Sequence, residues 1–352
     1  MKPPATLSRA ASAKALRAVA RRAARGATPT RQLLRRGTVK KATLAAYTTA
    51  VERFETWARQ RCLPFNDMRG ADLALTLYFS ERYLEGERPA AGRYTRYGYL
   101  LLRTGCDGDR NGDMPESRRA LQGWAHLDPG RSRDPLPDIV VHWIASWLVD
   151  QDELEAAFAV MLQYDTYGRP SEVLNLMRLD FTTPQPAAGP LFGNDWTVNL
   201  ANSADGRTRK NGELDDSVRI GSPGRLWMRD VTQLYLKGCR GPGRIFNLTL
   251  THYERLFRSA AKALDLAALK PCPHAVRHSG PSHDTWARTL QLSEVKKRGG
   301  WKHDKSVARY EKHAKLLRQL ELMSSRAQTS TLRATRALPL KLLAALRKRS
   351  LH

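Results

Sequence analysis

The chain has 352 residues, 41% of them apolar and 26% charged, which is a globular composition and a length sufficient for two domains. Fifty-nine lysines and arginines stand against 34 aspartates and glutamates, so the formal charge is +25. This excess favours a polyanionic partner, because cationic side chains that neutralise phosphates release counterions. No apolar run approaches the roughly 18 residues of a membrane span, so we expect no membrane protein.

The cysteines and the N-terminal residues give expectations about the cellular compartment of the protein. Four widely spaced cysteines form no Cys-x-x-Cys motif, which argues against a disulfide scaffold and favours a reducing, intracellular compartment. Residues 1–51 contain twelve lysines or arginines and no acidic residue. We interpret residues 1–37 as a basic disordered arm that adds DNA affinity, or as a targeting segment. An organellar transit peptide and a nuclear-import signal both fit, and in a eukaryotic host we expect the nucleus.

Residues 38–127 show the apolar periodicity of amphipathic helices. The apolar positions of the first helix recur every three or four residues: Leu44, Tyr47, Val51, Phe54 and Trp57. Three further helices are predicted over Asp72–Leu84, Tyr94–Arg103 and Arg118–Leu127. Together they predict a small all-helical domain.

A charged, proline-punctuated segment, residues 128–137, is expected to be a linker. After it, Ile139–Val149 and Glu153–Tyr167 are predicted as apolar-rich helices. Trp196–Ala201 and Ser217–Ile220 alternate like strands, and the polar turn between them predicts a β-hairpin. Helices are expected to return at Thr251–Leu266 and to continue, with breaks, to about residue 321. The predicted fold class is therefore mainly helical with a small β-hairpin or sheet (α+β).

Residues 322–352 form a basic C-terminal tail. Within it, Leu340–Arg349 has the pattern of an amphipathic helix. The sequence leaves three positions open for this helix: on a membrane surface, against a neighbouring protomer, or against its own domain.

Four features of the second half of the chain combine residue types that suit phosphate chemistry. They are Gly168-Arg169-Pro170-Ser171-Glu172, Lys210 in the hairpin turn, Pro273-His274-Ala275-Val276-Arg277-His278, and Gly299-Gly300-Trp301-Lys302-His303 followed by Tyr310. Trp301 and Tyr310 are nine residues apart. In this order, over about residues 38–320, the features resemble the tyrosine recombinase (phage integrase) family.

That family carries a Gly-Arg-x-x-Glu box, a hairpin lysine, a His-x-x-Arg box, and a His or Trp nine residues before a terminal tyrosine. The tryptophan variant, followed here by Lys302, Asp304 and Lys305, is most similar to eukaryotic mobile-element members of the Crypton type. The resemblance implies a SAM-like core-binding domain for DNA at residues 38–127 and a catalytic domain at residues 138–321. It also implies a homotetramer that acts on two DNA duplexes.

The resemblance, together with the chemistry of phosphate transfer, assigns the main roles. Arg169 and Arg277 are expected to clamp the non-bridging oxygens, because a guanidinium is planar and permanently charged. Tyr310 would be the nucleophile and would form a covalent 3′-phosphotyrosine. No cofactor is expected.

The remaining roles concern protons and support. His274 is the candidate base or phosphate-orienting group, and Lys210 the acid that protonates the leaving 5′-oxygen. The indole N–H of Trp301 can donate to a phosphate oxygen, but it cannot transfer a proton as an imidazole does. Glu172 is expected to hold the histidine or an arginine of the site in place. Three other cations compete with Lys210 for its role: Arg207, Arg209 and Lys237.

The histidines of this region suggest a second interpretation. His274, His278, His283 and His303 are close enough in sequence for a zinc cluster, but their spacing matches no usual zinc motif, so no metal is expected. We interpret His278 as a supporting or structural histidine. We interpret His303 as solvent-facing, or as a substitute for Trp301.

Two residues depart from a regular helical pattern at these boxes. Pro170 directly follows Arg169, at a first helical position where proline is tolerated. Gly280-Pro281 is expected to interrupt and kink the helix that carries Arg277.

The preferred interpretation is an active site-specific DNA recombinase or integrase. An alternative is a DNA-binding protein, derived from a mobile element, that has lost catalysis. An enzyme that relaxes supercoils would use the same residues. An RNA-binding role is disfavoured, because no aromatic stacking motif accompanies the positive charge.

Overall fold

The computed structural model describes residues 39–104, 114–130, 134–189, 193–202, 215–239, 241–310 and 313–349. These residues divide into two compact units, one within residues 39–130 and the other within residues 134–349. The division falls in the segment that the sequence predicts as a linker. The predicted basic arm, residues 1–37, lies outside the described residues.

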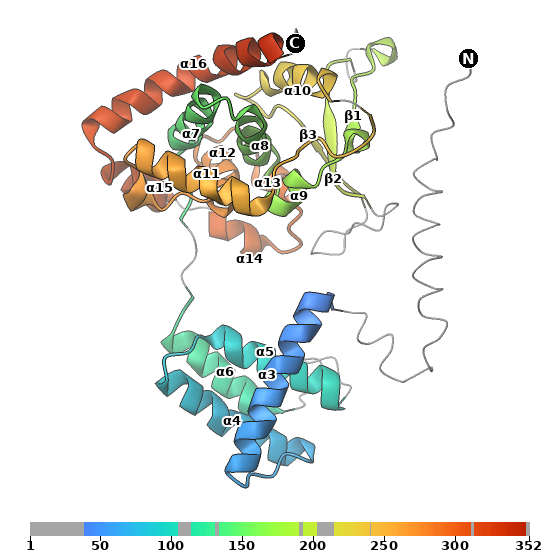
Figure 1. The fold of residues 1–352 in the computed structure, drawn as a ribbon, viewed down its shortest axis with the longest axis vertical. Helices are drawn as coiled ribbons and strands as arrows, with labels where there is room; N and C mark the ends of the chain where they lie inside the picture. Colours follow the sequence, from blue (N-terminus) through green and yellow to red (C-terminus); the bar gives the residue numbers. More distant parts are fainter. Residues whose placement is uncertain are drawn as a thin grey trace. The chain divides into compact units, whose positions relative to one another are not determined.

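The first unit is helical and corresponds to the periodic segments of the sequence (Figure 1). Its helices are α3 (Lys41–Gln60), α4 (Met68–Leu84), α5 (Pro89–Tyr99) and α6 (Pro115–Leu127), with a π-helical turn at Leu100–Thr104. Of the apolar positions predicted for the first helix, Val51, Phe54 and Trp57 are buried, while Leu44 and Tyr47 are partly buried against the same core. The four predicted helices are therefore confirmed.

The second unit combines many helices with one small sheet (Figure 1). Its first helices are α7 (Asp138–Asp150), α8 (Leu154–Thr166) and α9 (Pro170–Leu174). The strands are β1 (Phe181–Thr182), β2 (Thr197–Asn202) and β3 (Asp215–Arg219). The later helices are α10 (Met228–Lys237), α11 (Leu250–Ala263), α12 (Pro273–Trp286), α13 (Leu292–Gly299), α14 (Asp304–Val307), α15 (His313–Glu321) and α16 (Ser325–Arg349).

The sheet has the strand order β1-β2-β3 and is antiparallel throughout. Val198 pairs with Phe181 on one side and with Val218 on the other, and all three side chains are buried. The predicted hairpin is thus confirmed as β2 and β3, and the predicted α+β class is confirmed with it. The two-residue strand β1 was not predicted. The turn that carries Lys210 lies outside the described residues.

Helix α8 lies at the centre of the second unit. Each of its residues except Glu155 is buried, and it packs against α7, α12, α16 and α10. A helix that is apolar on all sides must be surrounded by other elements, which is what the sequence of Glu153–Tyr167 predicts. Three polar residues, Gln163, Asp165 and Thr166, are also completely buried, so each needs hydrogen-bond partners inside the unit.

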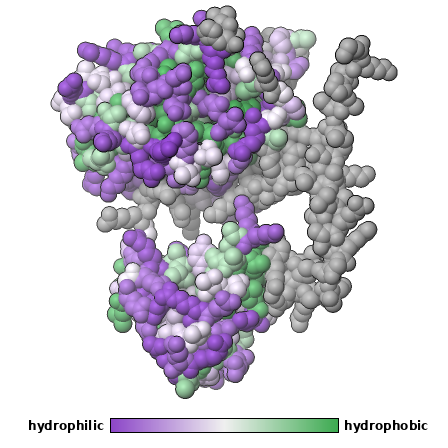
Figure 2. All heavy atoms as spheres, in the orientation of Figure 1, coloured by the Kyte–Doolittle hydropathy of each residue, from purple (hydrophilic) through white to green (hydrophobic). Residues whose placement is uncertain are grey.

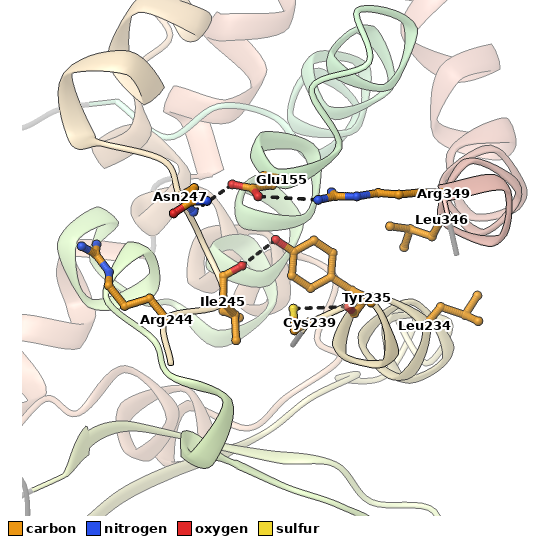
Figure 3. Close-up of a pocket in the computed structure, with 10 residues that line it drawn as sticks. Glu155, Leu234, Tyr235, Cys239, Arg244, Ile245, Asn247, Leu346 and Arg349 are labelled. Atoms are coloured by element: carbon orange, nitrogen blue, oxygen red, sulfur yellow. Dashed lines mark hydrogen bonds and ion pairs between the residues drawn. The ribbon is translucent and has the colours of Figure 1, made fainter. Parts of the chain in front are cut away.

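Helix α16 packs on its own unit, mainly against α7 and α10. Leu338 and Leu342 are fully buried. The Lys341 ammonium donates to the carbonyl and hydroxyl oxygens of Ser146 at 3.0 and 2.8 Å. Near its end, Arg349 pairs with Glu155 of α8, as Figure 3 shows. The sequence left three positions open for this helix, and in the structure the helix packs against its own domain.

Helix α12 corrects one prediction. Gly280 and Pro281 were expected to interrupt it, but the helix is continuous from Pro273 to Trp286 with Pro281 inside. Close packing explains this result, because a Cβ at Gly280 would lie 2.3 Å from the carbonyl oxygen of Tyr164. The contact holds α12 against α8, and tertiary packing outweighs the local cost of the proline.

The surface of each unit is largely polar. The faces shown in Figure 2 are covered mainly by hydrophilic side chains. Large apolar side chains that are exposed, such as Leu84 and Leu340, also occur. Within the described residues, no helix combines the length and the hydropathy needed to cross a membrane.

Candidate active site

The Gly168-Arg169 box forms the turn between α8 and α9. Tyr167 follows α8 in a left-handed conformation, with φ at 56°. A Cβ at Gly168 would lie only 2.6 Å from a methyl group of Val173, so this position requires glycine. Arg169 then precedes α9 as its N-cap, and Pro170 occupies the first turn, where proline fits.

Glu172 binds backbone and side chains at the start of α9. Its carboxylate accepts a hydrogen bond from the N–H of Arg169 at 2.8 Å, which closes a capping box. The same carboxylate accepts from the guanidinium of Arg169 and lies 3.6 Å from the Nη1 of Arg277. One negative charge therefore lies between the two arginines that the sequence predicts as a phosphate clamp.

Arg277 is held by two segments of the chain that are far apart in sequence. It is 5% exposed, and its guanidinium donates to the carbonyl oxygen of Tyr167 and, at 3.2 Å, to that of Gly299. Its Cζ lies 5.5 Å from the centre of the Trp301 ring. A guanidinium stays charged even when buried, so these contacts fix a permanent cation in one orientation.

Two glycines make room for Trp301. Gly300 ends α13 in the left-handed region, with φ at 61°. A Cβ at Gly299 would lie 2.0 Å from the Trp301 ring, so the indole fills the space that this glycine leaves. The ring is half-buried and also faces Tyr167, at 6.3 Å between centroids.

Tyr310 lies between two rings. Its centroid is 4.3 Å from that of Trp301 and 5.3 Å from that of His278, and the His278 ring is nearly parallel to it at 27°. The tyrosine belongs to a short 3₁₀ turn, Ala308–Tyr310, and is 6% exposed. The nucleophile predicted from the sequence is thus packed against the predicted tryptophan and one predicted histidine.

These contacts join six predicted residues into one cluster, which we call the catalytic cluster after the roles that the sequence predicts for its members. Each member touches the next in this order: Arg169, Glu172, Arg277, Trp301, Tyr310 and His278. They come from three stretches of chain, residues 169–172, 277–278 and 301–310, and the fold brings these stretches together.

Three predicted residues lie elsewhere or are not described. His274 is exposed in the first turn of α12, three residues before Arg277 and four before His278, so it shares their helix face. His303 is exposed at the start of α14. Lys210, like Arg207 and Arg209, lies outside the described residues, and Lys237 is exposed at the end of α10.

A buried ion network adjoins the cluster and was not predicted. Arg225, between β3 and α10, donates to both oxygens of Asp284 at 2.9 and 2.6 Å and to Asp165 at 3.1 Å. Asp165 also lies 3.2 Å from a guanidinium nitrogen of Arg298. The hydroxyl of Tyr167 donates to Asp284. We call Asp165, Arg225, Asp284 and Arg298 the ion network.

Burial and charge act in opposite directions on Asp165. Burial alone would raise its pKa, but Arg298, Arg225 and the backbone N–H groups of Gly221 and Ser222 outweigh that effect and lower the pKa. The carboxylate therefore stays ionised. One signal for the network was present in the sequence, because Asp165 is a charged residue near the end of a mostly apolar helix.

The structure does not arrange the histidines of this region as a zinc site. Among the described residues, no group of three or more His, Cys, Asp or Glu side chains is arranged to hold a metal ion. His278 faces Tyr310, whereas His283 lies 3.7 Å from Asp138.

A cavity of about 220 Å³ lies between α8, α10 and the end of α16 (Figure 3). Its polar groups bind one another: Tyr235 donates to the carbonyl of Ile245 at 2.9 Å, and Glu155 accepts from the N–H of Asn247 at 2.9 Å. It contains no residue of the catalytic cluster. We therefore assign it no part in the chemistry.

No protein-family model matches the chain, and no curated protein sequence matches it either. Among solved structures, the chain is similar to the integrase of the transposon Tn1549 in complex with transposon right-end DNA. The identity is 14%, the TM-score 0.49, and the match covers 85% of this chain and 94% of that one.

Two further solved structures are similar. One is the XerH site-specific recombinase bound to palindromic difH substrate in a post-cleavage complex, at 14% identity and a TM-score of 0.46, with 71% of this chain and 70% of that chain covered. The other is the XerA recombinase, at 14% identity and a TM-score of 0.34, with 80% and 96% covered. The function proposed below rests on the contacts within the catalytic cluster and not on these similarities.

Proposed function

We propose that this protein is a tyrosine-type DNA recombinase or integrase that cuts and rejoins DNA through Tyr310. One observation carries the proposal: two arginines, their shared carboxylate, a tryptophan and a tyrosine from distant parts of the chain form one continuous cluster. These are the residue types that transfer of a phosphodiester to a phenol requires.

The proposed reaction exchanges one phosphate ester for another. The Tyr310 oxygen forms a bond to the scissile phosphorus, and the bond from phosphorus to the 5′-oxygen breaks. The phenolic proton passes to a base, and the 5′-oxygen takes up a proton as it leaves. A 3′-phosphotyrosine and a free 5′-hydroxyl result, and reversal of the same step rejoins the strand without a cofactor.

The two arginines supply charge where the transition state develops it. Glu172 holds both guanidiniums on one side, and in the proposed reaction both guanidiniums would donate to the non-bridging oxygens. Removal of a single donor from such a site typically costs about 10²- to 10³-fold in rate. We propose Arg169 and Arg277 as the clamp for this reason.

The aromatic and histidine side chains divide the other tasks. The Trp301 indole N–H would donate to a phosphate oxygen, and its ring holds Tyr310 in place. Because an indole does not act as an acid or a base at neutral pH, we propose His274 as the base and Lys210 as the acid. Tyr310 is 6% exposed, so the scissile phosphate must approach a largely buried side chain.

The proposed partner is double-stranded DNA, bound as a homotetramer on two duplexes. The formal charge of +25 supports a partner rich in phosphate. Each phosphate contact would contribute a slope of about −0.9 to the dependence of log affinity on log salt concentration. The Crypton-type likeness of the tryptophan variant remains a prediction.

The test is capture of the covalent intermediate. DNA from the sequences that flank the gene is nicked near candidate cleavage points, so that the released fragment diffuses away and rejoining is blocked. An SDS-resistant adduct should form with the wild type in the presence of EDTA. It should disappear with Tyr310→Phe and persist with the control Tyr83→Phe, a tyrosine of α4 in the other unit.

Two results would overturn the proposal. An adduct that survives Tyr310→Phe would identify another nucleophile. No adduct, despite tight and salt-sensitive binding of the same DNA, would favour the catalytically inactive DNA-binding protein.

A further inference from the structure

Tyr167 contacts both the ion network and the catalytic cluster. Its hydroxyl donates to Asp284 of the network. Its carbonyl oxygen accepts from the guanidinium of Arg277, and its ring faces that of Trp301 at 22°. One side chain and its backbone therefore join a buried set of charges to two groups proposed to bind the scissile phosphate.

Tyr167 is also unusually well fixed. It is fully buried, and a Cβ at Gly280 of α12 would lie 2.7 Å from its ring. On another side, the Cζ of Arg298 lies 5.5 Å from the ring centre. Its left-handed backbone, with φ at 56°, is strained for a residue other than glycine and persists only where the surroundings enforce it. The close packing and the bond to Asp284 supply that enforcement.

The hydroxyl of Tyr167 acts as a donor. Burial, together with the negative charge of Asp284, raises its pKa well above the ordinary value of a phenol. Asp284 is itself fully buried and held by two bonds from Arg225. Asp284 is therefore a rigid acceptor, and the Tyr167 ring has one preferred position.

We propose that Tyr167 is a positioning residue: its bond to Asp284 fixes both the carbonyl group that orients Arg277 and the ring face on which Trp301 packs. The inference rests on the proposed function, because it concerns the rate at which the scissile phosphate is transferred to Tyr310. Small misplacements of a charge-stabilising group lower rates strongly, since its effect depends on distance and direction to the reacting atoms.

The first experiment compares two variants that each remove one buried hydroxyl beside α8. Tyr167→Phe keeps the ring and loses the bond to Asp284. Tyr164→Phe is the matched control, because its hydroxyl is buried in α8 without a hydrogen-bond partner among the described residues. Single-turnover adduct formation should be about tenfold slower for Tyr167→Phe, with unchanged DNA affinity, and unchanged for Tyr164→Phe. Equal rates for the two variants would overturn the inference.

A second substrate separates positioning from general loosening of the fold. A methylphosphonate at the scissile position has lost one charged oxygen, so its transfer depends less on Arg277. The defect of Tyr167→Phe should therefore shrink from about tenfold to less than about twofold on this substrate. A defect of the same size on both substrates would show a merely structural role.

A third measurement does not depend on activity. In protein labelled with ¹⁵N-arginine, the Nη1–H signal of Arg277, the group that donates to the Tyr167 carbonyl, is assigned by its loss in Arg277→Lys. We expect its slow hydrogen exchange to be retained in Tyr164→Phe and to be faster by about tenfold in Tyr167→Phe. Unchanged exchange in Tyr167→Phe contradicts the inference, whereas absence of any wild-type adduct contradicts only the proposed function.

Discussion

The indole of Trp301 and the phenol of Tyr310 face each other with centroids 4.3 Å apart and planes tilted by 33°. The tryptophan is also the residue that the Arg277 guanidinium approaches, at 5.5 Å. In the family that the sequence resembles, a histidine is common at this position. Trp301 instead has an N–H donor that does not ionise, and it adds a large ring surface. In the proposed reaction, the arginines therefore supply charge and other groups transfer the protons.

The space for Trp301 depends on Gly299, which gives the first prediction. Gly299 has an ordinary helical backbone, so alanine would fit the chain but would place its Cβ 2.0 Å from the indole. We expect Gly299→Ala to displace Trp301 from Tyr310 and to slow adduct formation by about a hundredfold. The control is Gly123→Ala in α6, where a Cβ meets nothing within 4 Å. That change should leave cleavage intact, and a normal rate for Gly299→Ala would contradict the assigned packing.

Glu172 has two functions that one substitution can separate. Glutamine can still accept the capping bond from the N–H of Arg169, but it removes the charge between the two guanidiniums. We expect Glu172→Gln to slow cleavage by roughly tenfold to a hundredfold, the value of a hydrogen bond to a charged group. Single-turnover adduct formation measures the effect.

A second capping box provides the control for that prediction. Glu294 accepts from the N–H of Gln291 at 2.9 Å at the start of α13 and is exposed. Glu294→Gln makes the same chemical change without touching either arginine. Equal losses in the two variants would mean that helix capping, and not charge, explains the effect of Glu172.

The ion network predicts a pH dependence of stability. The pKa of Asp165 is lowered in the folded protein. Such a group stabilises the fold above the unfolded-state pKa of about 3.9 and loses this contribution as the pH falls through the lower, folded-state value. The wild type should therefore exceed Asp165→Asn in free energy of unfolding by about 1 to 3 kcal/mol at pH 7.

The difference in free energy of unfolding between the wild type and Asp165→Asn should shrink below about pH 4. Protonation of Asp165 then removes from the wild type the same negative charge that the substitution removes from the variant. Urea unfolding between pH 7 and pH 3 measures it. The exposed Asp230→Asn in α10 should cost less than about 0.5 kcal/mol at neutral pH. A difference that stays constant through the acid range would contradict the role assigned to Asp165.

Two leucines of α16 test its packing. Leu342 is fully buried, whereas Leu340 is 75% exposed on the same helix. Leu342→Ala should destabilise the unit by about 2 to 5 kcal/mol, and Leu340→Ala by less than about 0.5 kcal/mol. Thermal unfolding at several protein concentrations provides the readout. A loss that grows on dilution would show instead that the helix packs on another protomer.

The fold was predictable from the sequence where periodicity carries the signal. The first helix was predicted at residues 43–57 and spans Lys41–Gln60, and the hairpin strands match within two residues. Strand β1 has two residues, too few to show alternation, so no local pattern indicates it. The effect of Pro281 was mispredicted because local rules do not include the contact between Gly280 and Tyr164.

The residues of the site likewise include some that the sequence predicts and others that it does not. Residues in short motifs, such as Arg169 with Glu172 and His274 with Arg277, could be named from their spacing. Asp165, Arg225 and Asp284 lie about sixty residues apart along the chain, and their pairing exists only in three dimensions. The sequence did not indicate a role for Tyr167, because an aromatic residue at the end of an apolar helix is common in a hydrophobic core.

The position of α16 limits which shortened forms of this protein can survive. A stop codon or frameshift upstream of residue 325 would delete Leu338, Leu342 and Leu346 and strip the covering from α7. Such a gene product would lose part of its core and not only a basic extension, so cells would degrade it. Truncation should therefore leave no stable remnant of this unit, whereas a point mutation at Tyr310 would leave a folded one.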